Sequence, residues 1–169
     1  TTVGYDLDKA KEFLDASGHG DGIACEFLVA NNPARLDIAT FWANSLKQIG
    51  IDLQINILDG ATINQRLKVE GTFDAFMWGV ATYTSKADYL LRHMDGIDTP
   101  PTLAICRWQN QEYTDFLNKG VAEKDPVKEQ EYTDEAQKLL YEHYPVIPLY
   151  QQQDTYVMVK ELKGVRDGT

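Results

Sequence analysis

The sequence predicts an α/β domain built on an open, mainly parallel sheet flanked by helices. Three apolar segments with strand character, residues 23–30, 51–58 and 73–81, alternate with segments whose apolar residues recur at helical spacing. Strand–helix–strand order favours parallel pairing, because the helix returns the chain to the same end of the sheet. With 169 residues, 43% of them hydrophobic, the chain can bury one sizeable core, so we expect residues 1–169 to form a single domain.

The helices of the first half are delimited by capping residues and glycines. Aspartate or asparagine can accept hydrogen bonds from the free N–H groups at the start of a helix, and glycine commonly follows the last turn. The expected helices begin at Asp6 or Asp8, at Asn32-Pro33 and at Asp59, and they end at Gly18, Gly50 and Gly71 respectively.

The second and third strands have different hydrophobic patterns. In residues 51–58, isoleucine and leucine alternate with polar residues, which indicates a strand with one buried face. Residues 73–81 are almost continuously apolar, which favours a central strand covered on both faces.

The sequence of the C-terminal part predicts two helices joined by a turn, followed by a strand. A short helix leads to a turn at Lys124-Asp125-Pro126, where Asp125 suits the N-cap and Pro126 the first position of a long helix. Pro145 ends that helix, and the apolar residues 146–150 read as a strand. The loop of residues 95–101, DGIDTPP, is expected to be irregular and mobile.

The charge balance excludes two classes of partner. A formal net charge of −10 and an isoelectric point near 4.7 argue against binding nucleic acid or an anionic membrane surface, since both need a basic face. No apolar run approaches the ~20 residues of a membrane span. The first residues show no signal peptide.

Few residues in the sequence suggest chemistry of their own. His93, Asp95 and Asp98 are potential metal ligands, but nothing fixes their geometry, and a hydrated acidic loop is the favoured interpretation. No nucleophile elbow, phosphate-binding glycine loop or zinc-type Cys/His spacing is recognisable, so we expect no catalysis, metal or cofactor. Cys25 and Cys106 allow one disulfide, although a cysteine on a strand also serves as a small buried hydrophobe.

A series of short motifs, in a fixed order, points to one protein family. The motifs are YDLDKAK with FL and ASG (residues 5–18), NPAR (32–35), LKQIGIDL (46–53), GTFDA (71–75), NQEYTDFL (110–117), DPVK (125–128), AQKLL (136–140) and PVIPLY (145–150). Together they resemble the C-terminal lobe of extracytoplasmic solute-binding proteins of ABC importers, in the dipeptide, oligopeptide and nickel class known as family 5.

The resemblance implies one lobe of a periplasmic-binding-protein type II fold. In this family two lobes close on a ligand, and the closed form is presented to a membrane permease. The resemblance places Trp78, Gly79, Thr82 and Tyr83 in the ligand-contacting segment, because WGVATY is similar to the family's W-x-A-D-Y. From spacing alone, Trp78 and Tyr83 could equally be core aromatics of a buried strand.

Thr82 departs from the family pattern. Peptide-binding members carry an acid there that pairs with the ligand's α-ammonium, and a threonine hydroxyl cannot neutralise that charge. A ligand other than a free-amine peptide, such as a sugar or a metal chelate, becomes plausible. Asp88 could replace the acid, although its simpler role is that of a solvated residue in the first turn of a short helix.

The implied function is the substrate-binding component of an ABC importer, with this chain as one wall of the interlobe cleft. The implied partners are a small-molecule ligand (a peptide, sugar or metal chelate), the other lobe and an ABC permease, with no nucleic acid. The implied location is extracytoplasmic, either the periplasm or a lipoprotein at the cell surface. Two alternatives are a ligand-sensing domain of a signalling protein and a hydrolase with an acidic cleft on the same sheet.

Overall fold

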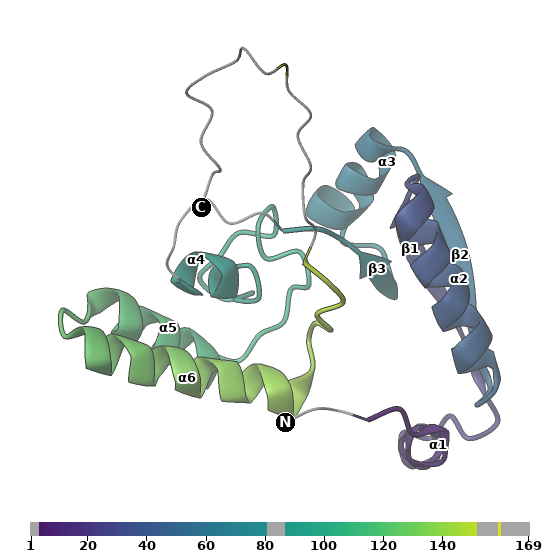
Figure 1. The fold of residues 1–169 in the computed structure, drawn as a ribbon, viewed down its shortest axis with the longest axis horizontal. Helices are drawn as coiled ribbons and strands as arrows, with labels where there is room; N and C mark the ends of the chain where they lie inside the picture. Colours follow the sequence, from purple (N-terminus) through teal and green to yellow (C-terminus); the bar gives the residue numbers. More distant parts are fainter. Residues whose placement is uncertain (1–3, 81–86, 152–158, 160–169) are drawn as a thin grey trace.

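The structure is a computed structural model that describes residues 4–80, 87–151 and 159. The elements, in chain order, are α1 (Leu7–Ala16), β1 (Ile23–Ala30), α2 (Pro33–Lys47), β2 (Ile51–Leu58), α3 (Gly60–Asn64), the π-helix η1 (Gln65–Glu70), β3 (Ala75–Met77), α4 (Ala87–Arg92), α5 (Gln111–Ala122) and α6 (Pro126–His143). The sheet with α2, α3 and η1 forms one end of the molecule, and α4, α5 and α6 form the other (Figure 1).

The described strands form a parallel sheet in the order β2-β1-β3. The bounds of β1 and β2 match the predicted strands, and Ile23 pairs with Ile51 at the start of their register. Parallel pairing across helical crossovers confirms the predicted α/β class.

The third strand is shorter than predicted, and it is not the central one. β3 spans only three residues and pairs on one side with β1, which is the central strand of the described sheet. At its start the Asp74 carboxylate accepts the Glu26 N–H (2.8 Å), so a side chain replaces a backbone pair. At the end of β3, the last pair is Met77 with Val29, and β1 itself ends one residue later, at Ala30. The apolar pattern of residues 73–81 therefore predicted a longer strand than the described residues form, and Gly79 and Val80 beyond β3 are exposed.

Helices cover both faces of the sheet. On one face α2 packs against alternate residues of β1 and β3, and the buried centre of this cluster is Phe27, Val29, Ala39 and Met77. On the other face α3 and η1 pack against the intervening residues, and the buried centre is Leu28, Ile63, Leu67 and Ile105. The alternation of β1 side chains between the faces explains why its burial is high on both.

The helical hairpin α5–α6 packs against α4 and forms a separate hydrophobic cluster. Tyr113 lies at its centre, fully buried, and its hydroxyl donates to the backbone oxygen of Leu91 in α4 (2.7 Å). As predicted, Asp125 caps α6 and Pro126 occupies its first position. Burial of the Tyr113 phenol raises its pKa well above the ordinary value.

One predicted helix has an irregular second half, and one predicted strand is wrong. The helix expected from Asp59 to Gly71 forms, with Asp59 as its N-cap and Gly71 as its C-cap; it begins as α3 and continues as the π-helix η1, where Gly71 N–H donates to Arg66 O (2.7 Å). The strand expected at residues 146–150 does not form. Pro145 and Pro148 lack backbone donors, and the segment runs from the end of α6 toward β3 as irregular chain (Figure 1).

Candidate functional site

The carboxyl ends of the three parallel strands meet at one edge of the sheet, which we call the carboxyl edge. It comprises residues 31–35 after β1, 59–62 after β2 and 78–80 after β3. Open α/β sheets bind ligands beyond this edge, because helix N-termini and loops converge there. Asn32 caps α2 by accepting the Arg35 N–H (3.2 Å), and Asp59 caps α3 by accepting the Ala61 and Thr62 N–H groups.

Trp78 is the first residue after β3, and its indole has two contacts of interest. One is with the buried cluster on the η1 face of the sheet, so the side chain is half-buried in packing. The other is with Lys68, whose Nζ lies over the indole ring 5.4 Å from its centroid. Trp78 is therefore anchored by the core while part of it stays open at the carboxyl edge.

Gly79 follows Trp78 and is exposed. A Cβ atom placed on Gly79 would lie 3.0 Å from Nη2 of Arg35, so the missing side chain lets the Arg35 guanidinium approach the chain closely. Arg35 belongs to the first turn of α2, which packs on the face of the sheet opposite η1. Lys68 and Arg35 thus reach residues 78–79 from opposite faces.

The structure does not place the other predicted ligand-contacting residues at the carboxyl edge. Thr82 and Tyr83 lie outside the described residues. Asp88 lies in the first turn of the short helix α4 and is half-buried. The described residues therefore bring together Trp78 and Gly79 at the carboxyl edge.

The carboxylate of Asp59 is the acidic group that the carboxyl edge contributes through its capping residues. Both of its oxygens are engaged: one accepts the Ala61 and Thr62 N–H groups, and the other accepts the Thr62 hydroxyl (2.7 Å). These hydrogen bonds, that of the Thr62 hydroxyl first, hold the pKa of Asp59 below its usual range. The Asp59 carboxylate therefore caps the N-terminus of α3 with both of its oxygens.

The histidine–aspartate cluster has a structural role, and the hydrated acidic loop expected there was a wrong interpretation. Asp95 is 1% exposed, and it accepts hydrogen bonds from the Thr114 hydroxyl (2.8 Å) and the Ile97 N–H (3.1 Å). It also pairs with Arg92 (3.3 Å). The backbone of residues 95–101 is irregular, as predicted, but Asp95 fastens it to α5. Within the described ranges no group of three or more His, Cys, Asp or Glu side chains could hold a metal ion.

Both cysteines are free thiols, so the possible disulfide is not formed in this structure. Cys106 is half-buried, and its thiol faces the backbone oxygens of His93 (3.8 Å) and Met94 (3.9 Å). Burial raises the pKa of both thiols, and Asp74 adds to the effect at Cys25. For both cysteines the raised pKa favours the thiol over the thiolate.

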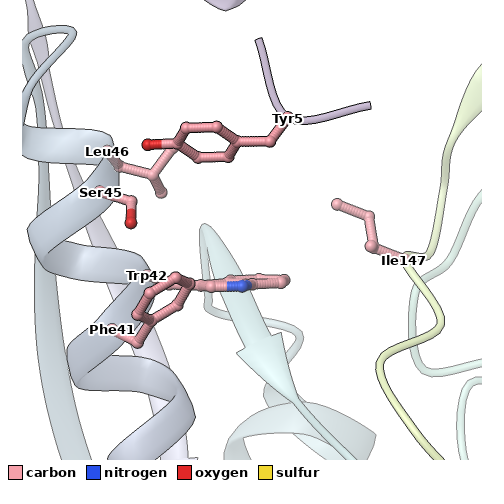
Figure 2. Close-up of a pocket in the computed structure, with 6 residues that line it drawn as sticks. All are labelled: Tyr5, Phe41, Trp42, Ser45, Leu46 and Ile147. Carbon is pink, nitrogen blue, oxygen red and sulfur yellow. The ribbon is translucent and has the colours of Figure 1, made fainter. Parts of the chain in front are cut away.

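A pocket with a volume of about 210 Å³ lies away from the carboxyl edge, on the second half of α2. Figure 2 shows side chains of α2 on one side of it, with Tyr5 and Ile147 approaching from two other segments. The lining residues are Tyr5, Phe41, Trp42, Ser45, Leu46 and Ile147. The lining is mostly apolar and has no charged group, so it offers little to orient a polar ligand.

Sequence reasoning missed Arg35 and Lys68 as neighbours of the candidate site. Arg35 lies within the NPAR motif, which marked the start of a helix, and Lys68 looks like one of several solvated charges on a helix. Their proximity to residues 78–79 depends on how α2 and η1 pack on the two faces of the sheet. A local pattern carries no signal for that proximity.

Comparison with known proteins identifies the family. The profile of bacterial extracellular solute-binding proteins, family 5 Middle, matches residues 1–99. The glutathione-binding protein GsiB of Escherichia coli (strain K12) is 26% identical over an alignment 167 residues long, which covers 95% of this chain and 33% of that protein. The chain therefore spans about a third of the length of the curated relatives it matches. These relatives are solute-binding proteins rather than enzymes.

Solved structures share the fold. HbpA2 from Haemophilus parasuis matches with a TM-score of 0.81 at 22% identity, over 85% of this chain and 29% of that one. NikA from Staphylococcus aureus, in complex with Ni(L-His)2, matches with a TM-score of 0.77 at 18% identity, over 86% and 31%. The periplasmic binding protein DppA from Helicobacter pylori, in complex with the peptide STSA, matches with a TM-score of 0.76 at 23% identity, over 86% and 28%. The fold is thus that of the periplasmic binding proteins of type II, and the chain belongs to the bacterial extracellular solute-binding proteins of family 5.

Proposed function

We propose that this chain is the C-terminal lobe of a substrate-binding component of an ABC importer and forms one wall of an interlobe ligand cleft. The observation that carries the proposal is the position of Trp78-Gly79 at the carboxyl edge of a parallel sheet in a member of this family. A half-buried aromatic with a locked position is the kind of group that grips a ligand with little loss of side-chain entropy.

The ligand is a small molecule of the peptide or chelate kind. The relatives named above bind glutathione, the peptide STSA and Ni(L-His)2, which supports amino-acid derivatives as the ligand class. The sequence carries Thr82 where peptide-binding members carry an acid, so we do not expect a free α-ammonium to be anchored at that position. Thr82, Tyr83 and Asp88 stay candidate ligand contacts with Trp78 and Gly79.

Binding would work as a clamp. The ligand lies between two lobes, and closure is driven by contacts that exist only when both walls touch it. The closed protein then engages a membrane permease outside the cytoplasm, either from the periplasm or as a lipoprotein at the cell surface. In the described part of the chain no helix is long and apolar enough to cross a membrane. The acidic balance of the chain gives no basis for a nucleic-acid partner.

The test is ligand binding by the full-length protein, measured by calorimetry with glutathione, a tripeptide pool and a nickel–histidine chelate. We expect one of these probes to bind, and Trp78→Ala to weaken it about 10- to 100-fold, because a central aromatic contact is worth about 1–3 kcal/mol. Trp78→Phe keeps the core contact and is the matched control for folding. Unliganded melting temperatures check that both variants are folded.

Two outcomes would contradict the proposal. One is the absence of binding by every probe. The other is tight binding that survives Trp78→Ala unchanged, which would place the ligand elsewhere. Thr82→Asp tests the ammonium question separately: we expect no gain in affinity, because an unpaired carboxylate buried on closure loses its hydration. Loss of affinity when a bound peptide is N-acetylated would show that another acid, Asp88 first, holds the ammonium.

A further inference from the structure

Among the described residues, the ammonium group of Lys68 is directed at the candidate site rather than at an acidic side chain. Its Nζ lies 5.4 Å from the centroid of the Trp78 indole, within the range in which a cation is attracted to the face of an aromatic ring. The ion pairs found in the described part of the chain involve other groups, so Lys68 pairs with no carboxylate there. Both side chains are half-buried, and such a contact is stronger where water is partly excluded.

The backbone of η1 next to Lys68 is fixed to the sheet. Leu67, the preceding residue, is fully buried in the cluster on the η1 face, and its backbone oxygen accepts a hydrogen bond from Arg107 (3.3 Å). One residue earlier, the Arg66 guanidinium donates to both carboxylate oxygens of Glu26 in β1 (2.9 and 2.7 Å). η1 is a π-helix, a form that is rare in proteins and frequent at functional sites. The base of the Lys68 side chain therefore has a set position relative to β1.

The indole of Trp78 is only partly fixed by packing. Met77, the residue before it, is 5% exposed and pairs with Val29 of β1, so the sheet places the backbone of Trp78. The ring packs against the cluster on the η1 face but is only half-buried, and a tryptophan side chain can turn about two torsion angles. A cation over the ring favours one orientation, because the attraction depends on where the charge lies relative to the ring face.

We propose that Lys68 is a positioning residue: its ammonium holds the Trp78 indole in the orientation in which that ring meets the ligand. The proposal rests on the proposed function and adds how the aromatic contact is prepared before the ligand arrives. A ring that is already oriented loses less side-chain freedom on binding, so more of its contact energy appears as affinity. Lys68 acts through Trp78 and needs no contact with the ligand.

This role is separable from the ordinary role of a lysine at the end of a helix. Lys68 lies in the last turn of η1, where a positive charge is favourable near backbone oxygens without helical partners. That effect stabilises the helix and does not depend on Trp78. Removing the indole therefore distinguishes the two roles.

The first experiment is a double-mutant cycle on the full-length protein, measured by calorimetry with glutathione, a tripeptide pool and a nickel–histidine chelate as probes. We expect Lys68→Met to weaken whichever of these probes binds by about two- to fivefold, the effect of a cation–π contact of ordinary strength. Lys68→Arg keeps a cation over the ring and should restore most of the affinity. In the background of Trp78→Leu, Lys68→Met should change the affinity little, because the ring through which Lys68 acts is gone.

The second experiment observes the ring itself. In full-length protein labelled with fluorotryptophan, the fluorine resonance of Trp78 is the one that Trp78→Leu removes. We expect Lys68→Met to shift or broaden this resonance in the unliganded protein, because the ring then samples more orientations. Lys68→Arg should leave it sharp.

Lys119→Met is the matched control. The Nζ atom of Lys119 lies 5.4 Å from the centroid of the Phe116 ring in α5, so this variant removes a contact of the same kind and length outside the candidate site. It should change neither the affinity nor the Trp78 resonance. Unliganded melting temperatures verify that every variant is folded.

The possible failures are distinguishable. The positioning role is overturned, and the proposed function stands, if Lys68→Met leaves the affinity unchanged, whether or not the Trp78 resonance moves. It is also overturned if Lys68→Met costs as much affinity without the indole as with it, because Lys68 would then act on the ligand directly or through its charge alone. If no probe binds the wild-type protein, the proposed function is overturned and the positioning role with it.

Discussion

Asp95 illustrates how one side chain can organise a loop without regular structure. Its buried carboxylate accepts two hydrogen bonds from backbone N–H groups of the loop, at Ile97 (3.1 Å) and Asp98 (3.4 Å). The same group binds the Thr114 hydroxyl of α5 and pairs with Arg92 of α4. A buried carboxylate loses its hydration, and this loss is tolerated only when its oxygens accept hydrogen bonds from the protein. The oxygens of Asp95 do accept such bonds.

We predict that Asp95→Asn lowers the free energy of unfolding by about 2–3 kcal/mol. The amide keeps one acceptor oxygen but turns an NH2 group toward donors that need an acceptor, and hydrogen bonds to a charged group are worth about 1.5–3 kcal/mol. Urea denaturation measures the change. Asp98→Asn is the control, because Asp98 is exposed and accepts from Asn118; it should cost less than ~1 kcal/mol. Equal costs for the two variants would contradict the role of burial.

Glu26 gives a pH-dependent contribution to stability. Hydrogen bonds from the Arg66 guanidinium (2.9 and 2.7 Å), and then from Asn56 (2.8 Å), hold the pKa of Glu26 below its ordinary value of 4.5. The pKa is thus lower in the folded than in the unfolded chain. The stabilisation of the folded chain by ionised Glu26 is fully present above the pKa of the unfolded chain. It is lost as the pH falls through the pKa of the folded chain.

We therefore expect Glu26→Gln to flatten the acid limb of the stability curve. The wild type should lose stability as the pH falls below about 4.5, and the variant should lose less over the same interval. The difference should be about 1 kcal/mol, since the glutamate side chain is still 31% exposed and water screens the pair. Urea denaturation at a series of pH values measures it. Glu12→Gln, on the exposed face of α1, should leave the limb unchanged; a similar flattening there would refute the assignment.

At the scale of elements, the sequence predicted the helices and strands whose ends are marked by neighbouring residues. β1 and β2 have the predicted bounds, because glycine, asparagine or aspartate flanks an apolar run. The start of α6 follows from Asp125 and Pro126 in the same way. Local signals could not predict the length of β3 or the absence of a strand at residues 146–150. A strand forms only where a neighbouring segment offers backbone groups for hydrogen bonds. For β3 that partner stops at Ala30.

The end of η1 depends on a glycine that faces an arginine. Gly71 has φ +68°, a left-handed conformation that residues with side chains rarely adopt, and a Cβ there would clash with the guanidinium of Arg107. The Arg107 guanidinium donates to Leu67 O (3.3 Å) inside η1, so it is not free to move away at no cost. Arg107 itself adopts a positive φ of 53°.

We predict that Gly71→Ala destabilises the chain by about 2–5 kcal/mol, the sum of ~1–2 kcal/mol for the left-handed backbone and ~1–3 kcal/mol for overpacking. Gly60→Ala, where nothing lies within 4 Å of the new methyl group, should change stability by less than ~1 kcal/mol. Thermal and urea unfolding report both. In the background of Arg107→Ala the cost of Gly71→Ala should fall by the overpacking part. A cost that is the same in both backgrounds would leave backbone strain as its sole cause.

At the scale of the whole molecule, the proposed function makes this chain one wall of a two-lobed site. The motif predicts Trp78 and Gly79 as ligand contacts; the structure places both residues at the carboxyl edge, and their contact with a ligand stays a prediction. Arg35 and Lys68 could not be predicted, because their neighbourhood is created by helices packing on opposite faces of the sheet. Many large apolar side chains are exposed, Phe41, Ile57 and Tyr141 among them. Such exposure suits a chain that spans about a third of its relatives.

The last prediction is that this chain alone binds the ligand of the full-length protein weakly or not at all. A cleft ligand is normally enclosed over most of its surface, and a single wall leaves one side of it in water. Losing about half of the contacts should remove several kcal/mol, and each ~1.4 kcal/mol costs tenfold in affinity, so a micromolar ligand would bind at millimolar concentrations or above. Closure cannot restore the loss, because the contacts that drive it need both walls.

Calorimetry of the isolated chain and of the full-length protein, with the same probe and buffer, measures the difference. A cooperative unfolding transition of the isolated chain must first show that it is folded, so that weak binding reflects the missing wall. Trp78→Ala should reduce affinity in the full-length protein and have little left to reduce in the isolated chain. If the isolated chain binds as tightly as the full-length protein, one wall suffices, the clamp is not the mechanism, and a free-standing ligand-sensing domain becomes the better description of this chain.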